Sequence, residues 1–388
     1  MTASIIGWAH SPFGKLQDQT VEDLIVGVAR EAIAHAGIAP GDVDAIFLGH
    51  FNAGFSAQDF TAALTLEADD GLRFKPATRV ENACATGSAA VHQAVTAITA
   101  QKAKVVLVVG VEQMTLCSGS EIARNLLKAS YLPETAGIPA GFAGVFGQIA
   151  DAYFSKYGDQ SDALAMIAAK NHANGVGNPY AQLRKDFGFD FCRNESAQNP
   201  IVAGPLKRTD CSPVSDGAAA LIIASDEVAA NAPRAVRFRA TAHVQDYLPL
   251  AKRDVLAFEG CTRAWTEAFD RSGVRLSDLS FVETHDCFTM AELLEYEAMG
   301  LTAPGRGAEA VMEGWTRKDG RLPVNPSGGL KAKGHPIGAT GVSMHALSAM
   351  QLCGEAGDMQ VPGATLAGIY NMGGVAVANY VSILERSR

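Results

Sequence analysis

Short runs of apolar residues alternate along the chain with longer segments whose apolar residues recur at helical spacing. The short runs have the length of buried strands and cover residues 3–9, 45–48, 80–83, 105–109, 366–370 and 375–384. Leu24, Val28 and Ile33 follow the period of a helix and predict one over residues 20–36. Another helix is predicted over residues 85–100, between two of the strands. Strands that alternate with helices are typical of an α/β fold.

Two patterns recur in the second half of the chain. Residues 29–50 (AREAIAHAGIAPGDVDAIFLGH) resemble residues 264–286 (AWTEAFDRSGVRLSDLSFVETHD), and each copy predicts a helix, a glycine stop, a polar turn and a strand. An Ala-Thr-Gly triplet also recurs at residues 85–87 and 339–341, near the start of a later helix. Two matches in the same order, roughly 240 residues apart, indicate an internal duplication into two similar α/β halves.

The join between the halves is predicted near residues 231–237, where a polar stretch contains a proline. We therefore expect an N-terminal half over residues 1–232 and a C-terminal half over residues 233–388. The region from about residue 117 to 205 interrupts the alternation, and we interpret it as an insertion that includes a helix over residues 151–172. Insertions above a rigid scaffold are where ligand contacts gather.

Composition and charge narrow the possible roles. The net charge of −9 and the pI near 5.5 argue against nucleic acid and anionic membranes as partners. No apolar run reaches the ~20 residues of a membrane span, and the first residues lack the basic start of a secretory signal. The seven cysteines are scattered without a CxxC pair, which is typical of a reduced, intracellular chain. We expect a cytoplasmic protein without a metal site, because its histidines and cysteines are dispersed along the sequence.

Cys84 falls where a predicted strand ends and a helix begins, in the segment VENACATGSAA. The unpaired N–H groups and the dipole at a helix start stabilise a thiolate and lower its pKa. The small residues around Cys84 leave room for an acyl group. A cysteine in apolar surroundings is more often a small core residue, so the position alone leaves both interpretations open.

His335 lies in a glycine-rich and proline-rich loop, NPSGGLKAKGHPIGATG. Held between Gly334 and Pro336, its imidazole is suited to transfer a proton or to activate a thiol. A phosphate-binding loop is a weak alternative, because neither GxxxxGK[ST] nor GxGxxG is present. A purely structural loop remains an equally good interpretation.

Two further segments place polar groups at strand ends. The segment VETHDCFTM puts His285 and Cys287 after a predicted strand, where sites of α/β proteins form. An aspartate helix cap beside a buried cysteine explains it equally well. Residues 371–374 (NMGG) form either a hairpin turn or a backbone N–H donor for an oxyanion.

Together these motifs resemble the thiolase family, and the resemblance spans nearly the whole chain. It is carried by Cys84 in ENACATGSAA, by His335 in GGLKAKGHPIGATG, by the NMGG turn and by TDCSPVSDGAAALIIAS at residues 209–225. Many thiolases have a cysteine where this chain has Asn371, and an Asn-Glu-Ala-Phe motif where it has His-Asp-Cys-Phe. Both departures resemble the sterol-carrier-protein type of thiolase, here expected to stand alone without a fused sterol-carrier domain.

The resemblance implies a role for each residue of the site. Cys84 would carry the acyl group and His335 would accept its proton. Cys287 would act as acid and base at the α-carbon, and His285 would hold a water at the enolate oxygen. The N–H groups of Cys84 and Gly373 would bind the thioester oxygen. We expect Cys84 to ionise readily and Cys287 to have a pKa near the working pH.

The resemblance also implies a fold and partners. Duplicated βαβαβαββ halves would form a five-layered αβαβα sandwich in a homodimer or tetramer. Coenzyme A (CoA) and acyl-CoA would be substrates, with no permanently bound cofactor, and the pantetheine would enter beneath the inserted region. A partner subunit is also compatible with this picture. Phe288, Phe146 and Met372 are candidates for the acyl pocket, although single apolar residues are more often plain core.

Three rival functions are weaker. A retro-aldol lyase acting on a CoA thioester is disfavoured by the presence of Cys84. A decarboxylating ketoacyl synthase is disfavoured because no second histidine loop resembles that family. A non-catalytic acyl-CoA-binding subunit is disfavoured because Cys84, Cys287 and His335 occur together with His285.

Overall fold

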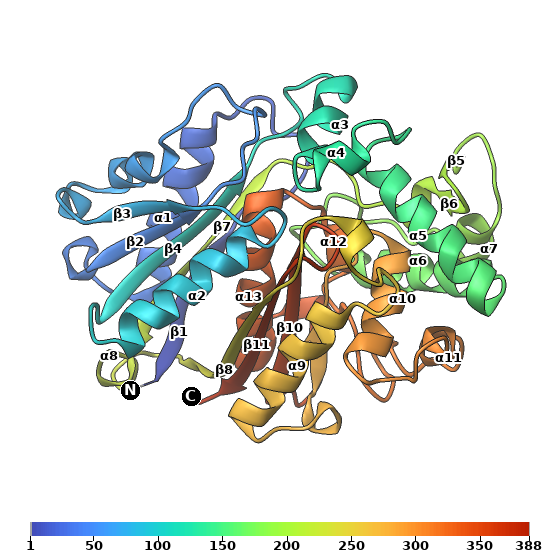
Figure 1. Ribbon diagram of the computed structural model, residues 1–388. Helices are drawn as coiled ribbons and strands as arrows, with labels where there is room; N and C mark the ends of the chain where they lie inside the picture. Colours follow the sequence, from blue (N-terminus) through green and yellow to red (C-terminus); the bar gives the residue numbers. More distant parts are fainter. Residues whose placement is uncertain (1, 388) are drawn as a thin grey trace.

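A nine-stranded mixed sheet forms the centre of the protein, seen in a computed structural model that describes residues 2–387 (Figure 1). The strands in spatial order are β3 (Ala77–Val80), β2 (Ala45–Gly49), β4 (Val105–Glu112), β7 (Gly217–Ser225), β1 (Ala3–His10), β8 (Val236–Gln245), β11 (Ala378–Arg386), β10 (Leu366–Gly373) and β9 (Phe281–Glu283). In the first half, β2 is parallel to β3 and β4, and β7 is antiparallel to β4 and β1. In the second half, β9 is parallel to β10, and β11 is antiparallel to β10 and β8. The two halves therefore repeat one strand pattern, and they join where β1 pairs with β8.

Helices lie on both faces of each half of the sheet and produce five layers. Helix α1 (Val21–Ala36) packs on the outer face of the first half, and α9 (Glu259–Ser272) packs on the outer face of the second. Between the halves lie α2 (Thr86–Thr99) and α13 (Ile337–Cys353), which contact each other and the inner faces (Figure 1). Helix α13 is buried on all sides from its first residue to Leu352, because it is enclosed by other elements. The predicted αβαβα sandwich of duplicated halves is confirmed.

The motif shared by residues 29–50 and 264–286 folds in the same way in both copies. Gly37 and Gly273 end their helices in the left-handed region, at φ of 69° and 67°. Asp42 and Asp278 each accept a backbone N–H at the start of the following turn, at 3.0 and 2.9 Å. The repeated letters therefore encode a helix stop and a turn that leads into β2 or β9.

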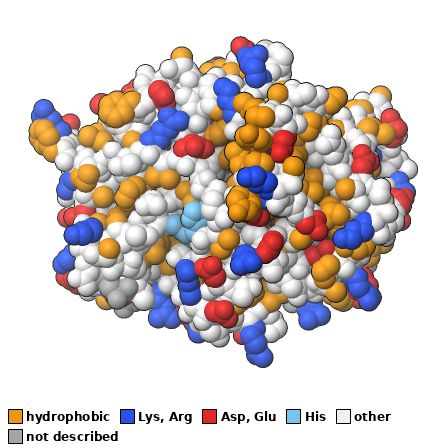
Figure 2. Space-filling model, viewed as in Figure 1, with side chains coloured by type: hydrophobic (Ala, Val, Ile, Leu, Met, Phe, Trp, Pro, Cys, Tyr) orange, Lys and Arg blue, Asp and Glu red, His pale blue; other side chains and the backbone are white. Residues whose placement is uncertain are grey.

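Residues between β4 and β7 form the insert. It contains α3 (Gly119–Leu127), α4 (Leu132–Thr135), α5 (Phe142–Tyr157), α6 (Ser161–Val176), α7 (Gly188–Arg193) and the hairpin of β5 (Ile201–Ala203) and β6 (Leu206–Lys207). The single helix predicted over residues 151–172 is wrong, because Gly158 at φ 89° separates α5 from α6. On the face shown in Figure 2, apolar side chains gather near α4. The exposed large apolar side chains of the insert are Leu116, Tyr131, Leu132, Val176, Ile201 and Val202.

The remaining elements are short. They are the helices α8 (Asp226–Ala229), α10 (Thr289–Ala298), α11 (Gly307–Met312) and α12 (Gly329–Lys333), and 3-10 turns at Pro40–Asp42, Thr61–Ala68, Asp70–Leu72, Arg208–Asp210, Leu250–Lys252, Leu276–Asp278 and Gly357–Met359. Among residues 2–387, no helix is both long enough and apolar enough to cross a membrane.

Two predicted strands are displaced at the site. The strand predicted over residues 80–83 is β3, which ends at Val80, and Ala83 adopts a left-handed φ of 50°. The last hairpin turns later than predicted, because Gly373 still pairs with Ala378. Residues 371–373 therefore belong to β10, and the turn covers residues 374–377.

Candidate active site

Three segments far apart in the sequence meet at one cavity of about 210 Å³. Cys84 enters it from the start of α2, Cys287 from the segment after β9, and His335 from the loop before α13. The other lining side chains are mainly apolar, and many come from the insert. The structure thus brings together the two cysteines and the histidine that the sequence singled out.

The Cys84 sulfur lies beside backbone N–H groups. The tight turn with Ala83 at φ 50° precedes it, and the backbone N–H groups of Gly374 and of Cys84 itself act to lower the pKa of the thiol. The proposed donor Gly373 is the neighbouring residue and ends β10, where a side chain would collide with the carbonyl of Asn82. The role predicted for the N–H of Gly373, to bind the thioester oxygen, stays a prediction.

His335 is held at both its backbone and its ring. Its N–H donates to Oγ of Ser215 at 3.0 Å, and its Nδ1 lies 2.7 Å from Oγ1 of Thr340. Because the Thr340 hydroxyl donates to the carbonyl of Pro336 at 3.0 Å, it accepts the proton of Nδ1. Nε2 of His335 is then unprotonated and free to act as a base.

His285 carries its proton on the other ring nitrogen from His335. Its Nδ1 lies 2.8 Å from Nδ2 of Asn371, an amide donor that also donates to the carbonyl of Cys84 at 3.2 Å. Nδ1 must therefore accept, so Nε2 carries the proton and has no partner among the described residues. The rings of His285 and His335 stand edge to face with centroids 5.0 Å apart. The site thus pairs a histidine that accepts with a histidine that donates.

Burial sets the resting charge of the site. It raises the pKa of Cys84 to about 12, and it lowers the pKa of His335 to about 3 with help from the charge of Lys333. Burial, then the neighbouring Cys84, raises the pKa of Cys287 well above its usual range. The predicted ready ionisation of Cys84 and the predicted near-neutral pKa of Cys287 are therefore wrong, because desolvation outweighs the effect of the helix start. The site rests as neutral thiols beside neutral imidazoles.

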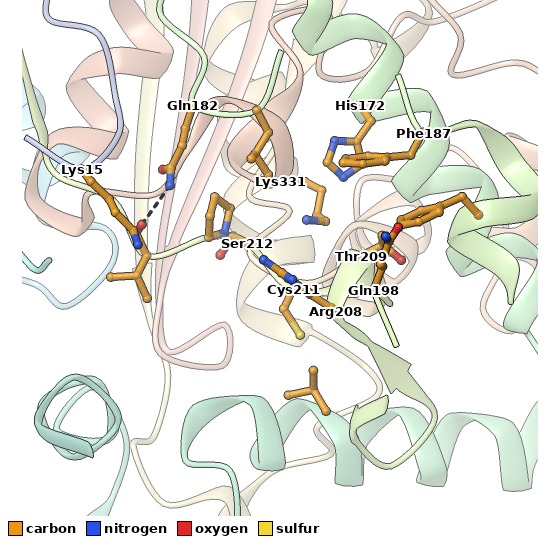
Figure 3. A pocket seen from close by; sticks show the side chains of 15 residues that line it. Lys15, His172, Gln182, Phe187, Gln198, Arg208, Thr209, Cys211, Ser212 and Lys331 are labelled. Atoms are coloured by element: carbon orange, nitrogen blue, oxygen red, sulfur yellow. Dashed lines mark hydrogen bonds between the residues drawn. The ribbon is translucent and has the colours of Figure 1, made fainter. Parts of the chain in front are cut away.

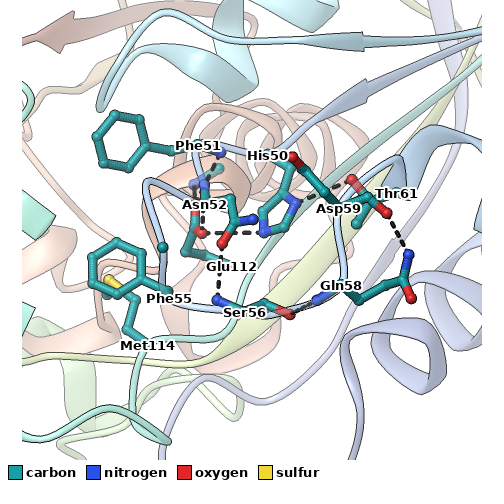
Figure 4. Close-up of polar contacts among 12 residues, drawn as sticks. His50, Phe51, Asn52, Phe55, Ser56, Gln58, Asp59, Thr61, Glu112 and Met114 are labelled. Atoms are coloured by element: carbon teal, nitrogen blue, oxygen red, sulfur yellow. Dashed lines mark hydrogen bonds and ion pairs between the residues drawn. The ribbon is translucent and has the colours of Figure 1, made fainter. Parts of the chain in front are cut away.

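A buried carboxylate that the sequence analysis missed fixes the histidine loop. Glu112 at the end of β4 accepts the N–H groups of Gly338 at 3.0 Å, Phe51 at 3.1 Å and Asn52 at 3.0 Å (Figure 4). Its Oε1 also lies 3.2 Å from Nε2 of His50. Glu112 thereby ties the first turn of α13, just after His335, to the loop after β2. The sequence signal that could have indicated this role of Glu112 is an acidic residue at the end of an otherwise apolar strand.

The three candidate acyl-pocket residues differ in position. Phe288 lines the cavity together with Phe142. Phe146 is fully buried and stacks on Phe288 with ring centroids 4.5 Å apart, so it supports the wall from behind. Met372 is fully buried and is not among the lining side chains.

Cys84, His285 and His335 form a cluster that could hold a metal ion. A donor atom of each of Cys84, His285 and His335 lies within 4.8 Å of the others. The argument that histidines and cysteines are too dispersed for a ligand cluster is therefore wrong, because folding brings Cys84 to two histidines that lie more than 200 positions along the chain from it. The three residues offer the soft sulfur and nitrogen ligands that zinc accepts.

Comparisons with known proteins agree with this fold and site. The model of the thiolase N-terminal domain matches residues 3–227, and the model of the thiolase C-terminal domain-like family matches residues 242–386. The acetyl-CoA acetyltransferase of Methanothermobacter thermautotrophicus is 35% identical over 386 residues, covering 99% of both chains. Human sterol carrier protein 2 is 33% identical over 366 residues, covering 90% of this chain and 65% of its own.

Solved structures show the same architecture. Human mitochondrial 3-ketoacyl-CoA thiolase superposes with a TM-score of 0.74 at 17% identity, over 100% of this chain and 99% of its own. The Ltp2-ChsH2(DUF35) aldolase superposes with a TM-score of 0.82 at 22% identity, over 100% and 98%. Fold and site define an α/β enzyme with a cysteine in a buried site. The chain belongs to the thiolase family, and its resemblance to the sterol-carrier-protein type is confirmed.

Proposed function

We propose that this enzyme transfers acyl groups between CoA thioesters, cleaving 3-ketoacyl-CoA by thiolysis or condensing acyl-CoAs in the reverse direction. One observation carries the proposal: a base and a nucleophile, His335 and Cys84, lie with donor atoms within 4.8 Å of each other in a cavity that also contains Cys287. The family match and the thiolase fold support it.

In the acylation step, the proton of the Cys84 thiol moves to Nε2 of His335 as the sulfur attacks the thioester carbonyl. Because both groups rest in their neutral forms, proton transfer and attack occur together. The N–H of Cys84 and that of Gly373 bind the carbonyl oxygen, and each such donor contributes about 3 kcal/mol in the transition state. The C–S bond to CoA breaks, and the departing thiolate takes the proton back from His335.

In the cleavage direction, Cys84 attacks the 3-keto carbon and the bond between the α- and β-carbons breaks. The enolate that leaves takes its proton from the thiol of Cys287, whose high pKa keeps that proton in place until then. Nε2–H of His285 donates to the enolate oxygen, directly or through a water. Free CoA then gives its thiol proton to Cys287 as its sulfur attacks the acyl-enzyme, and Cys84 leaves as a thiolate that takes its proton back from His335.

The surroundings of the site support several finer proposals. CoA and acyl-CoA act as substrates without a permanently bound cofactor, and the acyl chain lies along Phe288, with Phe146 and Met372 as supporting side chains. The pantetheine enters beneath the insert, whose residues line the cavity.

The halves divide at 232/233 with the insert at about 117–205, a division that the matched ranges 3–227 and 242–386 support. We place the enzyme in the cytoplasm as a homodimer or tetramer, with a partner subunit as an additional component in some assemblies.

A second candidate is a retro-aldol lyase, since one structural neighbour is the Ltp2-ChsH2(DUF35) aldolase. The cysteine in the cavity favours acyl transfer, because a lyase needs no covalent acyl carrier. A non-catalytic subunit would show neither activity.

Labelling with radioactive acetyl-CoA tests the proposal. Wild type and the control Cys353→Ala, which changes a cysteine outside the cavity, should both retain label. Cys84→Ala should retain none, and Cys287→Ala should be labelled but fail to cleave acetoacetyl-CoA with CoA. Undiminished labelling of Cys84→Ala would remove the assignment, and cleavage of a branched 3-hydroxyacyl-CoA without any label would favour the lyase.

A further inference from the structure

A second and larger cavity, of about 580 Å³, is shown in Figure 3. It adjoins the Cys84 cavity. The two cavities share part of their lining: Val202, Cys211, Ser212, Pro213 and Val214. We call the larger one the basic chamber, because Lys15, Arg208 and Lys331 line it and no carboxylate does. The chamber and the catalytic cavity thus adjoin along the segment that carries Ser212.

Lys331 supplies a buried positive charge to the chamber. Only 3% of this residue is exposed, and its ammonium makes no hydrogen bond or ion pair within residues 2–387. The nearest carboxylates are occupied elsewhere: Asp210 pairs with Lys207 at 3.3 Å, and Asp286 accepts the backbone N–H groups of Leu330 and Lys331. An ammonium on a nearly buried side chain without a protein partner favours the binding of an anion in the chamber.

His172 faces the same space from α6. It is 1% exposed, and neither of its ring nitrogens has a hydrogen-bond partner in the described chain. Its ring stands edge-on to Phe187 with centroids 4.7 Å apart. Burial and then the charge of Lys331 lower its pKa to about 3, which agrees with the nearness of the two groups in Figure 3. The neutral ring carries one N–H that can donate to a ligand.

The rest of the chamber is suited to a chain with a charged end. Its other walls include the apolar side chains of Leu183, Phe187 and Phe191. Lys15 and Arg208 are exposed, whereas Lys331 and His172 are buried. A monoanionic carboxylate loses its hydration at a buried position more easily than a phosphate dianion, so the buried pair favours a carboxylate.

We propose that Lys331 and His172 bind a carboxylate at the far end of the acyl chain, an inference that rests on the proposed acyl transfer. The substrate class is then ω-carboxyacyl-CoA thioesters, with the reacting thioester at Cys84 and the free carboxylate in the basic chamber.

Calorimetric titration of the Cys84→Ala protein tests this without turnover, so failure of catalysis would not be confused with failure of binding. The probes are an ω-carboxyacyl-CoA, the uncharged acyl-CoA of equal chain length, and free CoA. A charge-assisted contact predicts at least about tenfold tighter binding of the ω-carboxyacyl-CoA. Adding Lys331→Met should abolish this preference, and Lys331→Arg should keep most of it. Lys102→Met, an exposed lysine outside the chamber, is the matched control.

Two results would overturn the proposal. One is equal binding of the two thioesters by Cys84→Ala. The other is equal weakening of all three probes by Lys331→Met, which would mean that the ammonium binds a CoA phosphate. Urea unfolding separates these outcomes from misfolding: removal of an unpaired buried charge should leave stability unchanged or raised. His172→Phe, which lowers the preference by a smaller factor, provides a second variant should Lys331→Met unfold.

Discussion

Gly87 of α2 and Gly341 of α13 face each other where the two central helices meet: a Cβ on Gly87 would lie 2.8 Å from the nitrogen of Gly341. Each glycine ends one of the repeated Ala-Thr-Gly triplets, so the two copies of the triplet pack against each other. Cys84 precedes the first triplet and His335 precedes the second. The close approach of the two glycines therefore helps to bring the nucleophile and its base together.

We predict that Gly341→Ala destabilises the enzyme strongly. The new methyl would collide with the nitrogen of Ser88, a backbone atom that cannot move aside. Overpacking of this kind costs about 3 kcal/mol or more, measured by urea unfolding. Gly119→Ala at the start of α3 is the control, since its Cβ meets no atom within 4 Å. Equal effects of the two changes would contradict the role of the glycine contact.

Thr340 should control the rate of acylation through His335. Thr340→Val removes the oxygen that accepts the Nδ1 proton, so the ring loses its preferred tautomer and orientation. We expect acyl-enzyme formation to slow by about 10- to 100-fold, within the range of acid–base contributions. Thr340→Ser keeps the hydroxyl and should recover most of the rate. A Thr340→Val enzyme as fast as wild type in rapid-quench labelling would show that the hydrogen bond is not needed.

Asn371 should act through His285 rather than on substrate. Asn371→Leu removes the amide donor that keeps the proton of His285 on Nε2. Thiolysis should fall by about 100-fold, the typical loss of one oxyanion donor, while labelling of Cys84 falls less. In a His285→Ala background the same change should cost little more, because both act on one group. Additive losses in this double-mutant cycle would contradict the positioning role.

Stability should fall as the solution is acidified below pH 6.5. Burial lowers the pKa of His10 and of His335 to about 3, against 6.5 in the unfolded chain. Between these values the unfolded state binds more protons than the folded state, so the free energy of unfolding decreases as pH falls. Each such histidine contributes about 1.4 kcal/mol per pH unit in this window. Urea midpoints from pH 7 to 5 measure the slope, and His10→Gln should reduce it.

Much of the fold and the composition of the site could be predicted from the sequence. The hydrophobic periodicity, the glycine stops and the repeated triplets depend on neighbours in the chain, and they predicted duplicated α/β halves. The resemblance carried by the Cys84, His335 and His-Asp-Cys-Phe segments indicated which residues would meet. The roles proposed for them remain predictions.

Only the tertiary structure decided the protonation states of the cysteines and histidines in the site. Whether a thiol or imidazole is charged depends on water exclusion by residues from distant segments, so the high pKa of Cys84 could not be deduced from its helix start. The same holds for the opposite tautomers of His285 and His335, which are set by Asn371 and Thr340. A sequence specifies which polar groups exist; their partners are determined by packing across the whole chain.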